Sequence, residues 1–278
     1  MTKNLLKQIM SEENKSVKPK KAASKNVFSI DGLVDKIKTG YTINRGPKHT
    51  QKKTFAPSTI AYGHGECPRY WYLAFEGNIF EDYTDAYAAA NMQSGTLSHG
   101  RIQDAMMKSG VAKIFKNDQN EDTTEFKITH SDPGIFGYGD AIVMWDGEEI
   151  VGEIKTMTNE AFEIFKMKNA PKKGHLVQLL IYMKILKKPK GVLIYENKNN
   201  HDMVAFPVEV NDIYREWVDG AFEWMRKVRN AWETKQLPKK NYRSNSKICK
   251  TCPVKEACDN AGAGVIKLES LEELSEIM

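Results

Sequence analysis

The stretch GYGDAIVMWDGEEIVGEIKT, residues Gly137–Thr156, predicts a β-hairpin that carries charged residues. β-Branched residues dominate both sides of Asp146–Gly147, a dipeptide that favours a tight turn between antiparallel strands. Residues i and i+2 of a strand point to the same face, so Glu153 and Lys155 should project side by side, with the residue between them on the packed face. Asp140, on the preceding strand, is expected on the same side as this pair.

Two interpretations of these charges are open. One is a surface hairpin with an incidental ion pair. The other is a metal-dependent phosphodiesterase centre, because two neighbouring carboxylates repel unless a cation lies between them, and Mg²⁺ binds through carboxylates, water and phosphate. Such a cation activates water and neutralises charge on a phosphodiester. Lys155 would then contact the scissile phosphate or the attacking water.

Length and composition set broad limits. The 278 residues are 41% hydrophobic and 28% charged, which suits one large globular domain with appendages. The net charge of +5 is compatible with nucleic-acid binding but does not establish it. With no run of about 18 apolar residues and no signal-peptide pattern, we expect a cytoplasmic protein without a membrane partner.

Composition also divides the chain into segments. Residues 1–26 are rich in Lys and Ser without periodicity and predict a disordered basic arm. Residues 27–56 should hold a short helix and a linker broken by Gly and Pro. Residues 57–260 form the main domain, and residues 261–278 form an acidic tail.

Within the main domain, helical and extended patterns alternate. The expected helices cover residues 85–110 (interrupted at Ser94 and Gly95), 160–168, 175–188 and 211–236, the last capped by Asn211. The expected strands lie at 123–130, 134–145, 148–157, 191–198 and 202–210. This order predicts an α/β fold with a central mixed β-sheet flanked by helices.

Three further polar residues accompany the hairpin. Gln178 and Tyr182 are four residues apart on one helix face, where they interrupt an aliphatic stripe. Polar groups are least expected there without a partner, although a half-buried Gln beside a core Tyr is the structural alternative. His99, on the helix before the strands, would complete a His–Asp–Glu metal site, whereas a lone His is more often structural.

The four cysteines form a second group. Cys249, Cys252 and Cys258 have C-x2-C-x5-C spacing, and Cys67 lies far upstream. Disulfides are not expected in a cytosolic chain, which leaves metal ligation or isolated buried thiols, and the spacing favours metal ligation. Thiolates suit zinc or an iron–sulfur cluster, and spacing alone does not decide between them.

The pattern D-x(n)-E-x-K followed by Q-x3-Y resembles the PD-(D/E)xK nuclease superfamily, and more narrowly its RecB-like exonuclease branch. In that branch a G-x3-H segment lies upstream, as Gly95 and His99 do here. The resemblance implies a restriction-endonuclease-like core with Lys155 as the catalytic lysine. It implies that Gln178 and Tyr182 orient the site and contact the DNA backbone. The implied ligands of Mg²⁺ or Mn²⁺ are His99, Asp140, Glu153 and the carbonyl of Ile154.

The cysteines extend this resemblance. The segments CPRYWY and CKTCPVKEAC are similar to those of AddB-type helicase–nucleases and of the CRISPR-associated RecB-like exonuclease family. In these proteins four cysteines hold an iron–sulfur staple. The resemblance therefore implies a four-iron–four-sulfur (4Fe-4S) cluster that joins N- and C-terminal segments, with Zn²⁺ as the alternative. It covers about Cys67 to Cys258 and includes no helicase motif.

The expected function is that of a Mg/Mn-dependent deoxyribonuclease, an exonuclease on single-stranded DNA ends with endonuclease activity as a further option. DNA repair, recombination, CRISPR and viral DNA processing are the open settings, in a bacterium or in a virus-infected host, with a helicase or another DNA-processing protein as partner. A catalytically silent DNA-binding or assembly module is the alternative.

Basic and aromatic residues outside the hairpin supply candidate contacts to the strand. The alternative for them is a set of core aromatics and solvated charges. The candidate phosphate contacts are Arg69, Tyr182, Arg243 and Lys247, and the candidate stacking residues are Tyr70, Trp71 and Tyr72.

Overall fold

The computed structural model describes residues 30–271. The expected basic arm and the last seven residues of the acidic tail lie outside the described residues. The chain divides into two units, Met1–Lys38 and Thr39–Met278. Helix α2 (Leu33–Gly40) begins in the first unit, within the segment expected to hold a short helix, and all of its residues are exposed.

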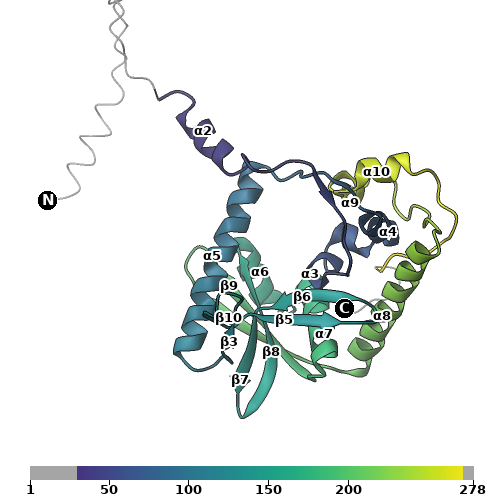
Figure 1. The fold of residues 1–278 in the computed structure, drawn as a ribbon. Coiled ribbons are helices and arrows are strands. Elements are labelled where there is room, and N and C mark those ends of the chain that lie inside the picture. Colours follow the sequence, from purple (N-terminus) through teal and green to yellow (C-terminus); the bar gives the residue numbers. More distant parts are fainter. Residues whose placement is uncertain (1–29, 272–278) are drawn as a thin grey trace, which may run out of the picture. The chain divides into compact units, whose positions relative to one another are not determined.

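A four-stranded mixed sheet forms the centre of the second unit (Figure 1). Its strands lie in the order β10 (Met203–Glu209), β9 (Lys190–Asn197), β8 (Glu148–Met157) and β7 (Ala141–Trp145). β8 and β9 are parallel, whereas the two outer pairs are antiparallel. Helices flank this sheet, so the predicted fold class, a mixed sheet with flanking helices, is confirmed.

The hairpin of β7 and β8 is the one that the sequence predicts. Trp145 pairs with Glu148 across the turn, and Ala141 pairs with Gly152 at the other end. Asp146 and Gly147 have φ angles of 50° and 76°, the left-handed conformations of a two-residue turn that matches the strand twist. The local turn residues therefore determine this register.

The expected strand over residues 134–145 is wrong at one point, because it breaks at Asp140. β6 (Ile135–Gly139) pairs with β5 (Phe126–His130) in a separate two-stranded sheet, and β7 begins at Ala141. Asp140 stands between the two strands rather than on the hairpin. Its carbonyl and carboxylate bind groups from other elements, so the ladder cannot continue through it.

Two helices cover opposite faces of the central sheet. α5 (Ala86–Lys108) packs Ile102 and Met106 against Ile154 and Val192. On the other face, α7 (Lys173–Leu186) packs against residues such as Leu193. β8 is therefore buried on both sides, and Glu153 faces α7 while Ile154 faces α5.

Helix α5 runs unbroken through Ser94 and Gly95, which corrects the expected interruption. Asp85 caps its start by accepting a hydrogen bond from the N–H of Ala88. A glycine inside a helix costs only about 1 kcal/mol relative to alanine. Gly95 lies where α5 approaches β8, since a Cβ there would stand 3.9 Å from Thr156 Oγ1.

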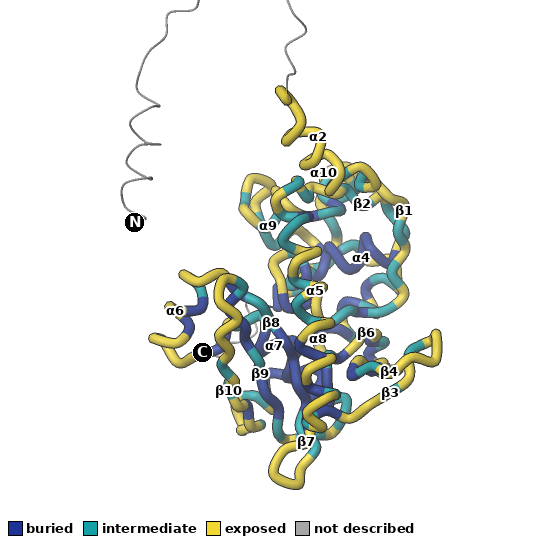
Figure 2. The backbone as a smooth tube through the Cα atoms, turned by 90° about the vertical axis from the view of Figure 1, so that its left-hand side faces the viewer, coloured by how far each residue is buried: buried dark blue, intermediate teal, exposed yellow. Residues whose placement is uncertain are grey.

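The remaining elements surround this core. Tyr70, Trp71 and Tyr72 of α4 are buried (Figure 2), which contradicts their expected role as stacking residues and supports the alternative of core aromatics.

No helix in residues 30–271 is long and apolar enough to cross a membrane. The other elements are β1 (Lys48–Thr50), α3 (Pro57–Ile60), η1 (Gly63–Glu66), α4 (Pro68–Glu76), β2 (Asn78–Phe80), β3 (Phe115–Lys116), β4 (Asp122–Thr123), α6 (Asn159–Lys168), α8 (Asp212–Glu233), α9 (Lys247–Lys250) and α10 (Lys255–Asn260).

The core assignment predicts unequal effects of two leucine truncations. Leu193 is fully buried in β9, so Leu193→Ala should lower the free energy of unfolding by about 2–5 kcal/mol. Leu97 on α5 is 70% exposed, so Leu97→Ala should cost less than about 0.5 kcal/mol. Urea unfolding followed by tryptophan fluorescence measures both. Equal losses would contradict the packing described.

Candidate functional site

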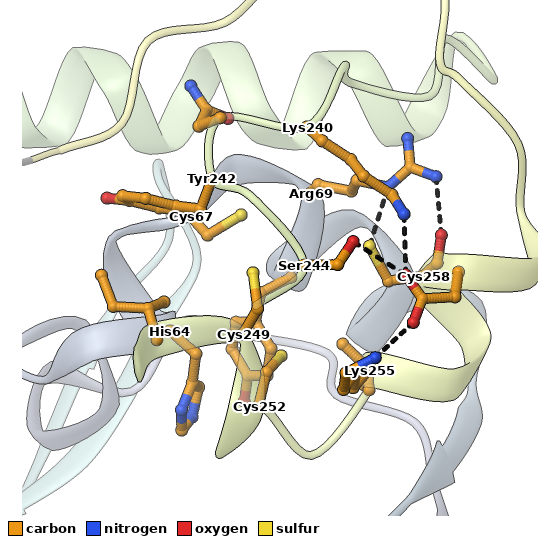
Figure 3. Close-up of a pocket in the computed structure, with 15 residues that line it drawn as sticks. His64, Cys67, Arg69, Lys240, Tyr242, Ser244, Cys249, Cys252, Lys255 and Cys258 are labelled. Carbon is orange, nitrogen blue, oxygen red and sulfur yellow. Dashed lines mark hydrogen bonds and ion pairs between the residues drawn. The ribbon is translucent and has the colours of Figure 1, made fainter. Parts of the chain in front are cut away.

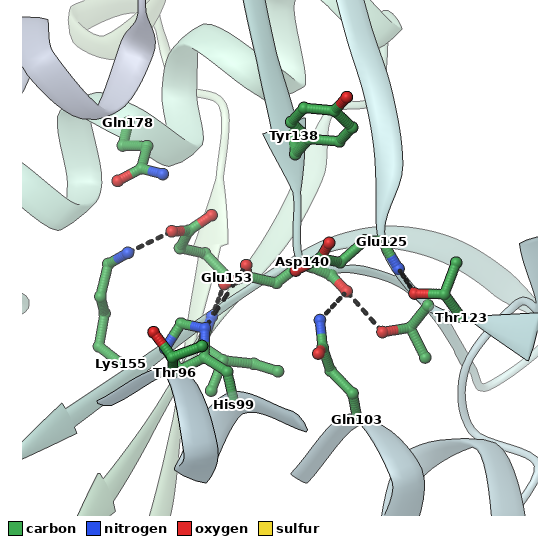
Figure 4. Close-up of polar contacts among 12 residues, drawn as sticks. Thr96, His99, Gln103, Thr123, Glu125, Tyr138, Asp140, Glu153, Lys155 and Gln178 are labelled. Atoms are coloured by element: carbon green, nitrogen blue, oxygen red, sulfur yellow. Dashed lines mark hydrogen bonds and ion pairs between the residues drawn. The ribbon is translucent and has the colours of Figure 1, made fainter. Parts of the chain in front are cut away.

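Asp140 is held in place by three elements (Figure 4). Its carbonyl accepts hydrogen bonds from Gln103 Nε2 (3.1 Å) on α5 and from Thr124 Oγ1 (2.7 Å) in the loop before β5. Its carboxylate Oδ2 accepts one from the N–H of Ile154 at 2.7 Å. The carboxylate therefore has a fixed position beside β8.

Gln103 and Thr124 were not predicted as site residues. Gln103 follows Gly95 and His99 at intervals of four, which places all three on one face of α5. That spacing is a signal that the sequence contains. The sequence contains no comparable signal for Thr124, because the Asp140 carbonyl becomes its neighbour only when β5 and β6 fold back on each other.

Glu153 and Lys155 lie together on β8, as predicted from their spacing. The Glu153 side chain is only 1% exposed, and Lys155 Nζ contacts its Oε1. Burial and then the nearby charge of Asp140 raise the pKa of Glu153 to about 8, although Lys155 opposes them. Burial alone would lower the pKa of Lys155, but the carboxylates of Glu153 and Asp140 outweigh it and raise that pKa. Two carboxylates thus share one ammonium.

His99 approaches the same carboxylate from α5. Its Nδ1 lies 3.7 Å from Asp140 Oδ1. Burial lowers the pKa of His99 despite the attraction of Asp140, so the ring is held in its neutral form. Neutral imidazole is the form that binds metal ions.

Gln178 and Tyr182 lie on α7, on the other side of β8. Gln178 Nε2 donates to the Tyr182 hydroxyl (3.1 Å), which donates to the carbonyl of Tyr138 (2.9 Å). Tyr182 is only 2% exposed, and its expected contact with the DNA backbone stays a prediction. Figure 4 shows Gln178 beside the pair formed by Glu153 and Lys155.

Two buried oxygens at this place lack hydrogen-bond donors among the described residues: Glu153 Oε2 and Gln178 Oε1. Buried acceptors of this kind are costly unless a donor or a cation satisfies them. Together with Asp140 and neutral His99, they form a hard donor set that suits a divalent cation.

The side chains do not yet converge on one point. In the described part of the chain, no three His, Cys, Asp or Glu residues are arranged to hold a metal ion as they stand. Lys155 occupies one oxygen of Glu153, so that carboxylate would have to turn toward Asp140. The Ile154 N–H binds Asp140, and a ligand role for the Ile154 carbonyl remains a prediction.

The four cysteines line a separate pocket (Figure 3). Cys67 precedes α4, Cys249 lies on α9, Cys252 follows it, and Cys258 lies on α10; none is in a disulfide. Burial raises the pKa of Cys67 to about 11 and that of Cys252 to about 12, and neighbouring thiolates add to both shifts. The fold therefore brings together thiols that are 180 residues apart in the chain.

Arg69 binds the cysteine segment rather than facing a substrate channel. It is 1% exposed, and its guanidinium donates to Cys258 Sγ (3.1 Å) and to the carbonyls of Pro238 (2.7 Å), Cys258 and Gly262. These contacts contradict its expected role in binding the strand. Arg243 and Lys247 are exposed, and their contact with a strand stays a prediction.

Comparisons with known proteins find low similarity. No protein-family model and no curated protein matches the sequence. The crystal structure of an alkaline exonuclease, LHK-Exo from Laribacter hongkongensis, shares 12% identity at a TM-score of 0.48, covering 71% of this chain and 95% of that one. LHK-Exo in complex with dAMP shares 15% at 0.47, covering 66% and 89%. The crystal structure of SSO0001 shares 18% at 0.41, covering 83% and 96%. Values this low do not assign the chain to a family.

A buried histidine beside the site was also missed by the sequence analysis. His175, in the first turn of α7, is buried with its Nδ1 3.1 Å from the hydroxyl of Tyr195. Burial, and to a smaller extent the charge of Lys155, lower its pKa to about 3. The folded protein therefore resists protonation of this ring.

This shift predicts a pH-dependent stability difference for His175→Asn. Below the ordinary pKa of about 6.5, unfolded wild-type chains bind a proton that the folded protein cannot accept, so the wild type loses stability as pH falls toward 3. The variant lacks this loss, so its stability relative to wild type should rise by up to about 1.4 kcal/mol per pH unit. Urea unfolding at pH 7 and pH 5 measures the change. A constant difference would contradict the neutral buried ring.

Proposed function

We propose that this protein is a Mg²⁺- or Mn²⁺-dependent deoxyribonuclease that hydrolyses phosphodiester bonds. The proposal rests on two carboxyl groups, those of Asp140 and Glu153, that lie at one largely buried place beside the ammonium of Lys155. Burial and the charge of Asp140 raise the pKa of Glu153, and oxygens of Glu153 and Gln178 lack donors among the described residues. A divalent cation would relieve this crowding, because it binds both carboxylates in their charged form.

The chain's own residues have defined tasks in this reaction. Asp140, Glu153 and His99 would hold the cation, which, when bound, activates water and neutralises charge on the phosphate. Lys155, released from Glu153, would contact a phosphate oxygen or the attacking water. Gln178 would orient the site, and Tyr182 would support Gln178 and the Tyr138 carbonyl.

For the substrate, we propose single-stranded DNA with a free end, cleaved as an exonuclease does. The net charge of +5 and the exposed Arg243 and Lys247 are compatible with a DNA strand. The sequence resemblance supports a role in DNA repair, recombination, or CRISPR or viral DNA processing, in the cytoplasm and beside a helicase or similar partner.

We further propose that the four cysteines hold a 4Fe-4S cluster. Zinc requires four sulfurs about 2.3 Å from one ion, whereas a cluster binds each thiolate at a separate iron. The four thiols line one pocket, and the resemblance of their spacing to that of cluster-bearing nucleases supports the cluster over zinc. Its role would be structural, tying the residues before α4 to α9 and α10.

The nuclease proposal is tested with end-labelled single- and double-stranded DNA in the presence of Mg²⁺ or Mn²⁺. Asp140→Ala and Lys155→Ala should each lower the cleavage rate by about 100-fold or more, because each removes a charge from the reacting phosphate's surroundings. Lys184→Ala, which removes an exposed lysine of α7 paired with Asp219, is the matched control and should cleave normally. DNA binding without cleavage by the wild type would instead favour the silent DNA-binding module.

The cluster is tested without any nuclease assay. Protein purified without oxygen should be brown and contain iron and sulfide, and Cys252→Ala should lose both and melt at a lower temperature. Asp140→Ala, the control, should keep the cluster, because Asp140 does not line the cysteine pocket. A colourless wild type with one zinc ion per chain would show that the alternative holds.

A further inference from the structure

A second buried carboxylate lies near the candidate site and has no part in the proposed reaction. Glu196 on β9 is 0% exposed, and its Oε1 contacts Nη2 of Arg101 on α5. The same oxygen lies 3.2 Å from Nδ1 of His201, which follows β9. The second oxygen, Glu196 Oε2, has no hydrogen-bond partner among the described residues.

This trio, Arg101, Glu196 and His201, adjoins the site through both α5 and the sheet. Glu196 is the register partner of Thr156, which immediately follows Lys155 on β8. Arg101 follows His99 by two residues on α5. The charge of Glu196 is close enough to His99 to raise its pKa against the effect of burial. The trio thus lies on the α5 side of the sheet, one strand away from Lys155 and near His99.

A purely structural ion pair between α5 and β9 is the alternative explanation. Such a pair would be expected to use most of the guanidinium. Here both contacts involve Nη2, whereas Nε and Nη1 donate to no residue in the described part of the chain. The Arg101 side chain is also 51% exposed. A guanidinium has five N–H donors, so three of them remain available at the surface.

We propose that Arg101 binds a phosphate of the DNA strand adjacent to the phosphate that is cleaved; this inference rests on the proposed nuclease function. Arginine donors bind phosphate oxygens through charge-assisted hydrogen bonds. The ligand is a phosphate group, either an internal diester or a terminal monoester of the strand. Its position follows from the contact of Arg101 with Glu196, on the strand next to β8, and from its place two residues after His99 on α5.

Glu196 is the positioning residue of this subsite. Because it is fully buried, it holds Nη2 from the protein side and limits the side-chain freedom of Arg101. The Arg101 side chain then loses less conformational entropy when the phosphate binds. His201 is mostly exposed and flanks the same oxygen, so it borders the subsite rather than anchoring it.

The test measures binding of fluorescein-labelled single-stranded oligonucleotides by anisotropy in EDTA, so that no cleavage occurs. Arg101→Gln should lower the affinity about tenfold, as expected for the loss of charged hydrogen bonds. It should also reduce the slope of log K against log salt by about 0.7, the value for one phosphate contact on a single strand. A residue that only fastens α5 to β9 would not change that slope.

Arg215→Gln is the matched control. Arg215 is an exposed arginine on α8 that pairs with Asp212, and α8 lies on the side of the sheet away from α5 (Figure 1). Its removal should leave both affinity and slope at the wild-type values. Should Arg101→Gln fail to fold, Arg101→Lys replaces it. Its single ammonium stays with Glu196, so affinity should still fall, and an unchanged affinity would overturn the proposal.

Oligonucleotides with 5′-phosphate, 3′-phosphate and unphosphorylated ends separate the two ligand sources. An effect of Arg101→Gln on all three assigns the subsite to an internal diester, and an effect on one phosphorylated end assigns it to that terminus. Folded Arg101→Gln with wild-type affinity and slope for all three overturns the inference. Because binding is measured without cleavage, a nuclease failure in the separate assay remains distinguishable from this result.

Discussion

Two carboxyl groups and one ammonium, those of Asp140, Glu153 and Lys155, are crowded at one largely buried place, and the rest of the site depends on how they are held. Crowding carboxyl groups away from water costs free energy, so such a group persists only when the surrounding structure fixes it. Asp140 is fixed by the N–H of Ile154 and by side chains of α5 and of the loop before β5. Glu153 is fixed by its place on a strand buried on both faces. Because these groups are held rigidly, the chain retains an arrangement that suits a bound cation although it lowers the stability of the fold.

Burial of β8 on both sides explains how the site gathers residues from distant parts of the chain. α5 covers one face and brings His99 to Asp140, while α7 covers the other and brings Gln178 to Glu153. Each helix is held by apolar side chains that alternate with the polar ones along its length. The packing that stabilises the sheet is therefore the same packing that positions the site.

The cysteine pocket is a separate structural centre. Arg69 joins α4 to the carbonyls of Pro238, Cys258 and Gly262, and aromatic residues of α4 pack into the main core. The C-terminal segment is thereby attached to a helix that begins at Pro68. A cluster bound by the cysteines would reinforce an attachment that the protein already makes through hydrogen bonds.

Short-range preferences along the chain account for the local features. The Asp146–Gly147 turn, the strand β8 and the Asn211 cap of α8 follow from short-range backbone preferences, and the i, i+2 spacing placed Glu153 beside Lys155. Helical spacing likewise placed Gln178 against Tyr182. The fold class as a whole could be predicted in this way, because the alternation of apolar and polar residues shows which face of each element is buried.

Which of these residues meet, and which are buried, depends instead on long-range packing. The break at Asp140, the anchors Gln103 and Thr124, and the burial of Arg69 and Tyr182 all depend on partners that are 14 to 193 residues away. The contact between Arg101 and Glu196 spans 95 residues. Pairing over such separations is set by how helices pack on the sheet, and residue type alone does not specify it. Composition can therefore suggest a polar residue's chemistry, but its neighbours determine whether that chemistry reaches a substrate.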